Sequence, residues 1–356
     1  MHAKPAETNP PYWNKESLTP CFGCLSCRDL PLCGGLRIER AAMSCLDFCR
    51  CEDPNACDKP CPRNTRMFVG RLLEVQGYEL GNVPRVPAIE AQRLPLSVPI
   101  LFQRNRRSDR LKSPAVAIRL KDLFSARTGQ LKYESREALA DHFLFDPAAQ
   151  LVIVGVGEDK PIESYWEKAR QCGFPGVLSK LKPTIVTAPN YSMFLNAVRW
   201  VDFHSMKRIA ICWKEMVESG LSAALHVHGR TDRDYERWTE FVVARDEVRA
   251  IAFEFGTGAA IPARAKWHIE KLIRLGKATN SRLQLLIKGG WGYAAELTPY
   301  FSQVVLIDSS IFMKSVQRKM AAVKNKKLVW EDAMTLHRQG IDGILQHNTD
   351  ISASLR

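Results

Sequence analysis

The sequence predicts an α/β protein: a TIM-like (β/α)8 barrel preceded by a small cysteine-rich, metal-binding domain. Short apolar runs recur eight times between residues 98 and 308, and amphipathic stretches follow most of them, as in a parallel barrel. Nine of the 11 cysteines stand between Cys21 and Cys61. A doubly wound open sheet is the alternative fold, because periodicity does not show whether a sheet closes into a ring.

The first predicted domain, residues 1–64, contains the clustered cysteines. Their spacing is C-x2-C-x2-C-x5-C followed by C-x3-C-x-C-x5-C-x3-C, with few hydrophobic residues between them. The N-terminus has no apolar secretory signal, so we expect a cytoplasmic location, where disulfides rarely persist. Metal binding would then supply the folding energy of this domain. The candidate ligands are Cys21, Cys24, Cys27, Cys33, Cys45, Cys49, Cys51, Cys57 and Cys61.

The cysteine pattern leaves the identity of the metal open. Eight thiolates would complete two tetrahedral Zn2+ sites, the first from the four cysteines of 21–33, and nine could bridge a larger zinc cluster. The C-x2-C-x2-C run and the Cys61-Pro62 pair also suit a [4Fe-4S] cluster. We expect two or more Zn2+ ions, because the sequence contains no recognisable electron-transfer path.

Residues 65–97 form a predicted connection, and the proline-rich stretch 81–99 is typical of a linker or a docking strap. The predicted barrel spans 98–330, and the tail 331–356 is expected to be partly ordered. The continuous apolar runs suit strands buried on both faces. The predicted strands are 98–102, 115–120, 151–156, 184–188, 222–228, 248–254, 283–288 and 303–308. The predicted helices are 135–145, 162–172, 193–219, 232–244, 262–278 and 311–323, with a short one at 293–300.

Polar residues and glycines gather where the predicted strands end. In a parallel barrel the working face lies at the carboxyl ends of the strands, so we expect these residues to line one pocket. The side chains are Asn190, His228, Glu254, Lys288 and Asp308. The glycines, which would let a ligand approach the backbone, are Gly229, Gly256, Gly258, Gly289, Gly290 and Gly292.

These side chains also have structural interpretations. His228 could be a hydrogen-bonded structural histidine, and Glu254 could simply pair with Lys288 inside the barrel. Asp308 could cap the helix that follows it. Their common position at strand ends is what favours a functional site.

The chain carries a net charge of +13, which favours a polyanionic partner, DNA or RNA first. Two basic runs, 104–112 and 314–330, follow the first and last predicted strands. First and last strands are neighbours in a closed barrel, so both runs could border one phosphate track. The alternative is a solvated basic surface without a partner. No apolar run is long enough to span a membrane.

The order of motifs resembles that of the tRNA-guanine transglycosylase superfamily, including its branch that modifies DNA with 7-deazaguanines. The segments that carry the resemblance are LHVHGRTDRDYERW, IAFEFGTGA, LQLLIKGGWG and VVLIDSSIFMKSVQRK. The resemblance implies a (β/α)8 barrel that exchanges a purine or 7-deazapurine base on a polynucleotide. It also implies Asp308 as the nucleophile, His228 with Gly229 as the base reader and Arg318 as a backbone contact.

Two departures from this family are visible. The segment TAPNYSMF has no carboxylate where the family carries one, so Asn190 or Ser192 would substitute for it. The chain also has no cysteine near its C-terminus, where the family holds zinc.

The mechanism that the resemblance implies is covalent catalysis through an aspartyl-glycosyl ester. His228 or Glu254 would transfer protons, and Lys288 would offset developing charge. Two other functions stay open: a catalytically silent barrel that binds nucleic acid or a protein, and an iron–sulfur oxidoreductase.

Overall fold

The computed structural model describes residues 37–38, 41–42, 65–102, 107–193, 199–325, 327–333 and 340–355. The nine clustered cysteines lie outside the described residues. Of the predicted domain 1–64, only two short strands are described, β1 (Arg37–Ile38) and β2 (Ala41–Ala42). The chain divides into two compact units. Unit 1 comprises Met1–Pro84, Tyr191–Ile211 and His228–Phe241, and unit 2 comprises Arg85–Asn190, Cys212–Val227 and Val242–Arg356.

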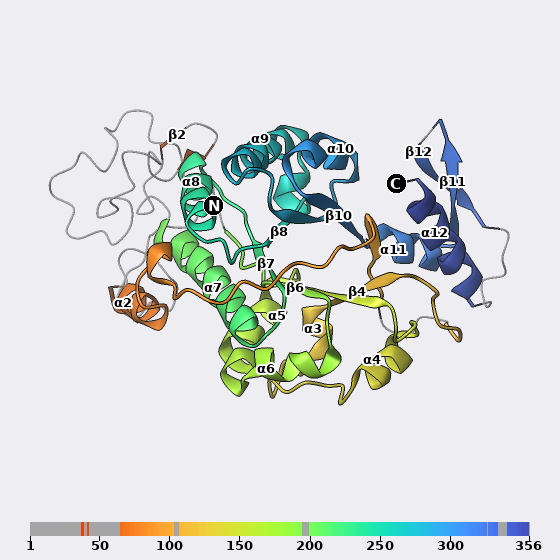
Figure 1. Ribbon diagram of the computed structural model, residues 1–356, viewed down its shortest axis with the longest axis horizontal. Coiled ribbons are helices and arrows are strands. Elements are labelled where there is room, and N and C mark those ends of the chain that lie inside the picture. The colour runs from red at the N-terminus through yellow and green to blue at the C-terminus, as the bar shows by residue number, and fades with distance from the viewer. Residues whose placement is uncertain are drawn as a thin grey trace, which may run out of the picture. The chain divides into compact units, whose positions relative to one another are not determined.

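Unit 2 is built around a sheet of eight parallel strands (Figure 1). Its strands, in the order in which they are hydrogen-bonded, are β3 (Ser97–Pro99), β10 (Gln303–Asp308), β9 (Gln284–Lys288), β8 (Ala250–Glu254), β7 (Ala223–His226), β6 (Ile185–Thr187), β5 (Gln150–Val154) and β4 (Ala115–Arg119). The two end strands meet where Ile100 bridges Ala117 in parallel and Leu101 N–H donates to the Ala117 carbonyl at 2.8 Å. The sheet is therefore a nearly closed, TIM-like barrel, as predicted, and not an open sheet.

The inside of the barrel is filled by alternate residues of the strands. Side chains along a strand point to opposite faces in turn, and an interior cluster gathers one residue in two from each strand. Its strand residues are Val98, Ala115, Ala117, Val152, Val154, Ile185, Ala224, Ala250, Ala252, Leu286, Val305 and Ile307. Because the other face of each strand is also buried, the residues between the first and the last of each strand are apolar. This explains the continuous apolar runs of the sequence.

Helices follow most of the strands. In unit 2 these are α3 (Leu120–Leu123), α4 (Arg136–Phe143), α5 (Asp159–Ser164), α6 (Phe174–Leu178), α9 (Pro262–Ala278), α10 (Ala294–Leu297) and α11 (Ser310–Val316). Helix α4 begins after Ser135, whose hydroxyl accepts from Ala138 N–H at 3.2 Å. Helix α9 begins with Pro262, which needs no hydrogen-bond partner in the first turn.

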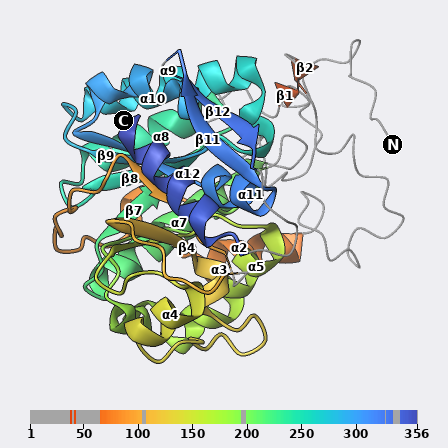
Figure 2. The same ribbon diagram turned by 90° about the vertical axis from the view of Figure 1, so that its right-hand side faces the viewer.

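The helix predicted over 311–323 was wrong in its second half. Helix α11 ends at Val316, and β11 (Lys319–Lys324) then pairs with antiparallel β12 (Lys327–Asp332). Between α11 and β11, Arg318 adopts the left-handed backbone conformation, with φ of 59°, which ends a helix. In the tail, helix α12 (Asp342–Ser354) lies beside this hairpin (Figures 1 and 2).

The proline-rich segment before β3 crosses the amino-terminal end of the barrel. Leu94 belongs to the interior cluster, and its backbone exchanges hydrogen bonds with the Gln303 amide at 3.3 and 2.5 Å. Gln284 donates to the Gln92 carbonyl at 3.1 Å. Residues 85–96, called the strap below, therefore close this end of the barrel.

Unit 1 contains helix α2 (Thr65–Glu74) and the first parts of α7 (Arg199–Glu218) and α8 (Asp232–Val243). It holds buried charges that are paired inside the unit. Arg230 contacts Asp202 at 2.9 Å, and both side chains are at most 4% exposed. Lys207 donates to the Glu79 carbonyl at 2.6 Å. In the part of the chain that the structure describes, no helix has both the length and the apolar character needed to cross a bilayer.

Candidate site at the carboxyl end of the barrel

Three of the predicted site residues form one hydrogen-bonded cluster. Glu254 ends β8 and Lys288 ends β9, and the two are direct partners in the strand register. Lys288 Nζ contacts Glu254 Oε1 at 2.5 Å, and Asn190 Nδ2 donates to Glu254 Oε2 at 3.2 Å. All three side chains are partly buried. The carboxylate is thus held between an ammonium and an amide at the mouth of the barrel.

Strand alternation directs this cluster into the barrel. Ala250 and Ala252 belong to the interior cluster, so Glu254, two residues further along β8, points inward as well. Leu286 places Lys288 on the same side of β9 by the same argument. The Asn190 Oδ1 atom is buried and has no hydrogen-bond partner among the described residues. An unpaired buried acceptor is costly, and here it stands next to the Glu254 carboxylate.

Glycines make room for the cluster. A Cβ atom on Gly256 would lie 2.8 Å from Glu254 Oε1, so any larger residue would displace the carboxylate. After β9, Gly290 has φ of 66°, and a Cβ there would lie 2.2 Å from the Phe255 ring. Gly289 also has a positive φ, of 72°. The backbone conformation therefore favours glycine at Gly289, whatever it binds, whereas Gly256 is needed only to keep the Glu254 side chain where it stands.

Gly155, which was not predicted from the sequence, positions Asn190. Gly155 N–H donates to Thr187 Oγ1 at 2.7 Å, and its carbonyl accepts from Asn190 N–H at 3.1 Å. A Cβ on Gly155 would lie 2.4 Å from the Thr187 carbonyl oxygen. A glycine directly after the apolar run 151–154 was the signal that could have identified it.

A second missed element is Arg119, at the end of β4. Ala115 and Ala117 are interior residues, so Arg119 points into the barrel too. Its guanidinium forms a two-point ion pair with Asp122, at 2.7 and 3.0 Å, and stands 4.6 Å from the centre of the Phe102 ring. A lone arginine that ends an apolar run was the available signal.

Asp308 lies at the same level of the barrel but on the other side of its strand. Val305 and Ile307 face the interior, and Asp308 pairs in register with Pro99, which stands between the interior residues Val98 and Ile100. Its Oδ1 accepts from the backbone N–H and the hydroxyl of Ser310, at 2.7 and 2.5 Å. The Asp308 carboxylate thus binds the first residue of helix α11, a structural role close to the helix cap that the sequence had left open.

Three other predicted residues, Ser192, His228 and Gly229, belong to unit 1. In unit 1, the His228 ring hydrogen-bonds the Tyr191 carbonyl at 3.1 Å, and the Ser192 carbonyl accepts from the Ser205 hydroxyl.

In unit 2, Gly258 lies in the short 3-10 helix Thr257–Ala260. Arg318, in the turn before β11, donates to the Gly340 carbonyl at 3.0 Å. Neither contacts the cluster around Glu254 through a hydrogen bond described in the structure.

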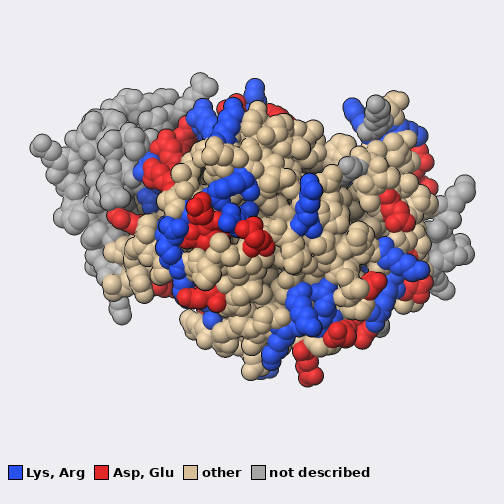
Figure 3. All heavy atoms as spheres, viewed as in Figure 1, with Lys and Arg blue, Asp and Glu red and all other residues tan. Residues whose placement is uncertain are grey.

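In the described part of the first basic run, residues 107–112, two arginines are paired inside unit 2. The side chain of Arg107 is 1% exposed and pairs with Asp342 at 3.3 Å, and it donates to the Phe143 carbonyl at 2.7 Å. Burial lowers the pKa of Arg107, while Asp342 raises it. Arg110 pairs with Asp141. On the face drawn in Figure 3, basic and acidic side chains are interspersed.

Among the described residues, no group of three or more His, Cys, Asp or Glu side chains could hold a metal ion. The predicted cysteine ligands lie outside those residues. No protein-family model matches the chain, and no curated protein matches its sequence.

Proposed function

We propose that the barrel modifies nucleic acid by excising or exchanging a purine base at the carboxyl ends of its strands. The observation that carries this proposal is the Glu254 carboxylate, held between Lys288 and Asn190 and directed into the barrel. A carboxylate at the mouth of a barrel, beside a cation and an unpaired amide oxygen, has the groups that attack at a sugar carbon and bind a base.

The geometry favours Glu254 over Asp308 as the reacting carboxylate. A carboxylate oxygen would attack the anomeric carbon and break the C–N bond to the base, and the electron pair would leave on the base nitrogen. An incoming base would reverse both changes. Lys288 would donate a proton to the departing base nitrogen and would take one back from the incoming base. The resemblance assigns the attack to Asp308, whose carboxylate is engaged by Ser310, so both carboxylates belong in the test.

Asn190 would read the base. Its Nδ2 group is committed to Glu254, which fixes the amide orientation and leaves Oδ1 as a buried acceptor. The ring N–H or amino group of a purine would satisfy this acceptor. Asn190 would thereby take the place of the carboxylate that the segment TAPNYSMF lacks.

The nucleic-acid partner is supported by the net charge of +13. With Arg107 and Arg110 engaged in unit 2, the β11–β12 hairpin is the better candidate for phosphate contact. Of its basic residues, Lys319 and Lys324 each pair with a carboxylate that is at least half exposed, so a phosphate could replace the pairing at little cost.

The test is exchange of labelled guanine into tRNA and into duplex DNA. We expect Glu254→Gln to lower the exchange rate by roughly 100-fold or more, and the exposed Glu134→Gln to leave it unchanged. Loss of exchange in Asp308→Asn but not in Glu254→Gln would identify Asp308 as the nucleophile, as the resemblance implies. Full exchange in both Glu254→Gln and Asp308→Asn would overturn the proposal. Salt-dependent binding without exchange by the natural chain would identify a silent binding barrel instead.

The cysteine block is proposed to bind two or more Zn2+ ions, and metal analysis of the purified chain tests this. A brown protein that contains iron and acid-labile sulfide would support the [4Fe-4S] alternative and the oxidoreductase function.

A further inference from the structure

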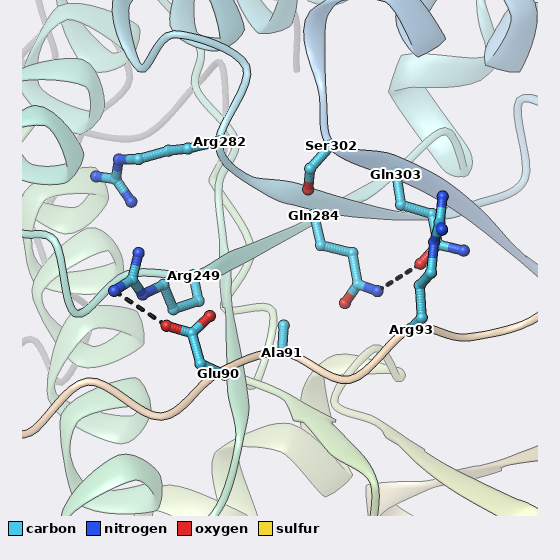
Figure 4. A pocket seen from close by; sticks show the side chains of 8 residues that line it. All are labelled: Glu90, Ala91, Arg93, Arg249, Arg282, Gln284, Ser302 and Gln303. Carbon is cyan, nitrogen blue, oxygen red and sulfur yellow. Dashed lines mark hydrogen bonds and ion pairs between the residues drawn. The ribbon is translucent and has the colours of Figure 1, made fainter.

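A polar cavity of about 370 Å³ lies at the amino-terminal end of the barrel, away from the cluster around Glu254. The starts of β9 and β10, the loops before β8 and β9, and the strap enclose it (Figure 4). Its lining residues are Glu90, Ala91, Arg93, Arg249, Arg282, Gln284, Ser302 and Gln303. The volume is at the lower end of the range of ligand pockets, roughly 300–1,000 Å³.

One buried acceptor in this cavity has no partner. Gln284 is 4% exposed, and its Nε2 group donates to both the Gln92 carbonyl and Gln303 Oε1, at 3.1 and 2.8 Å. These two acceptors fix the orientation of the amide. Gln284 Oε1 is then left buried without a hydrogen-bond partner among the described residues, and in Figure 4 it points away from Gln303. A ligand that donates a hydrogen bond would satisfy it.

Three arginines give the cavity a positive charge. Arg282 is fixed by the Val248 and Val242 carbonyls, at 2.5 and 2.8 Å, and lies beside Arg249 in Figure 4. Arg249 pairs with Glu90 at 3.1 Å, and the Glu90 side chain is 79% exposed.

Arg93 is the third arginine, and it makes no ion pair with the residues that the structure describes. It stands on the other side of the cavity, next to Gln303 (Figure 4). Arg282 also lies 3.9 Å from Asp246, whose side chain is 85% exposed. Three guanidinium groups therefore have two solvated carboxylates nearby, and an anion would balance the remaining positive charge.

We propose that this cavity binds a small hydroxylated phosphate ester, of the size of a sugar phosphate. The phosphate would contact Arg249, and a hydroxyl group would donate to Gln284 Oε1. Arg93, on the other side of the cavity, would donate to a second hydroxyl group. Such a ligand would join the strap to strands β9 and β10. The proposal does not depend on the base-exchange function, because none of the lining residues belongs to the carboxyl-end cluster.

The experiment is calorimetric titration of the full chain with ribose 5-phosphate, ribose and inorganic phosphate. We expect ribose 5-phosphate to bind at least 10-fold more tightly than either fragment, because only it engages both the arginines and the amide. Arg93→Gln and Arg249→Gln should each weaken this binding by about 10-fold or more. The exposed Arg127→Gln is the matched control and should bind as the natural chain does.

Two results would overturn the proposal. One is the absence of measurable binding of ribose 5-phosphate at millimolar concentration. The other is equal binding by the natural chain and by a double variant that lacks both Arg93 and Arg249. Urea unfolding of each variant would show that its fold is intact. Guanine exchange measured on the same variants should be unchanged, which separates this site from the proposed reaction.

Discussion

Glu254 and Asp308 show how one position along a strand decides what a carboxylate can do. Both end an apolar run in the sequence, and both lie at the carboxyl end of the barrel. Glu254 is in phase with Ala250 and Ala252 and faces inward, whereas Asp308 is out of phase with Ile307 and contacts Ser310. The phase was not predictable, because strands buried on both faces carry no polar alternation. The strand ends, in contrast, could be predicted.

At the same scale, His204 in unit 1 should make stability depend on pH. It is buried and hydrogen-bonded to Glu74 at 2.9 Å. Burial lowers its pKa and Glu74 raises it, while Arg208 and Arg71 lower it further, and the net direction is down. The unfolded chain, with the usual histidine pKa of about 6.5, therefore binds a proton that the folded chain does not. Stability is lost as the pH falls below that value, and the loss stops once the pH passes the lowered pKa.

We expect the free energy of unfolding to fall by at most about 1.4 kcal/mol per pH unit from this group. Urea unfolding at about pH 7 and about pH 5, on the natural chain and on His204→Gln, measures it. The glutamine keeps a polar partner for Glu74 and does not titrate. Identical pH dependence of the two proteins would contradict the prediction.

At the scale of elements, the eight strands were predictable from their apolar runs, but the hairpin β11–β12 was not. The segment 319–324 has small and long residues that suit either a helix or a strand. Its pairing with 327–332 and its contact with α12, where Asn348 Oδ1 accepts from Ala321 N–H at 2.6 Å, decide in favour of the strand. The contact with α12 joins residues 27 positions apart in the sequence, so local propensity could not show it.

Helix α9 begins without a side-chain cap, and this can be improved. Its N-cap residue, Ile261, has an extended backbone conformation and makes no side-chain hydrogen bond to the first turn, and that turn holds no acidic residue. Ile261 is also 56% exposed. We expect Ile261→Asp to raise the free energy of unfolding by about 0.5–1.5 kcal/mol, because aspartate both caps the helix and complements its dipole.

The matched control is Val243→Asp, another exposed apolar residue, which ends α8. A carboxylate at that end opposes the helix dipole, so this change should give no gain. Chemical unfolding of the three proteins decides the matter. An equal effect of both substitutions would mean that the removal of surface hydrophobicity, and not capping, is responsible.

At the scale of the whole molecule, the strap completes the barrel of unit 2. Leu94 is 4% exposed within the interior cluster, whereas Leu96, two residues later, is 43% exposed. We expect Leu94→Ala to lower the free energy of unfolding by about 2–5 kcal/mol, because it leaves a cavity at the base of the barrel. Leu96→Ala should change it by less than about 0.5 kcal/mol. If urea unfolding shows that Leu94→Ala lowers the free energy of unfolding as little as Leu96→Ala does, the strap is not part of the core.

The strands of the barrel could thus be predicted from the sequence, but the way the strap closes its amino-terminal end could not. The sequence identified a proline-rich strap, but its docking depends on Gln303 and Gln284, which lie about two hundred residues away from Leu94 and Gln92. The polar cavity could not be predicted for the same reason. Its residues come from four separate segments of the chain, and none of them marks the start of a motif.

The pairing of β3 with β10 determines when the barrel can be finished during synthesis. Leu306 N–H donates to the Leu96 carbonyl. The pairing of the first strand with the last one therefore cannot form until the last strand has left the ribosome. Until then the nascent chain presents two unpaired strand edges, which can bind other chains. Contacts of such long sequence separation also form slowly. Translation speed and chaperone supply should therefore influence the yield of this protein.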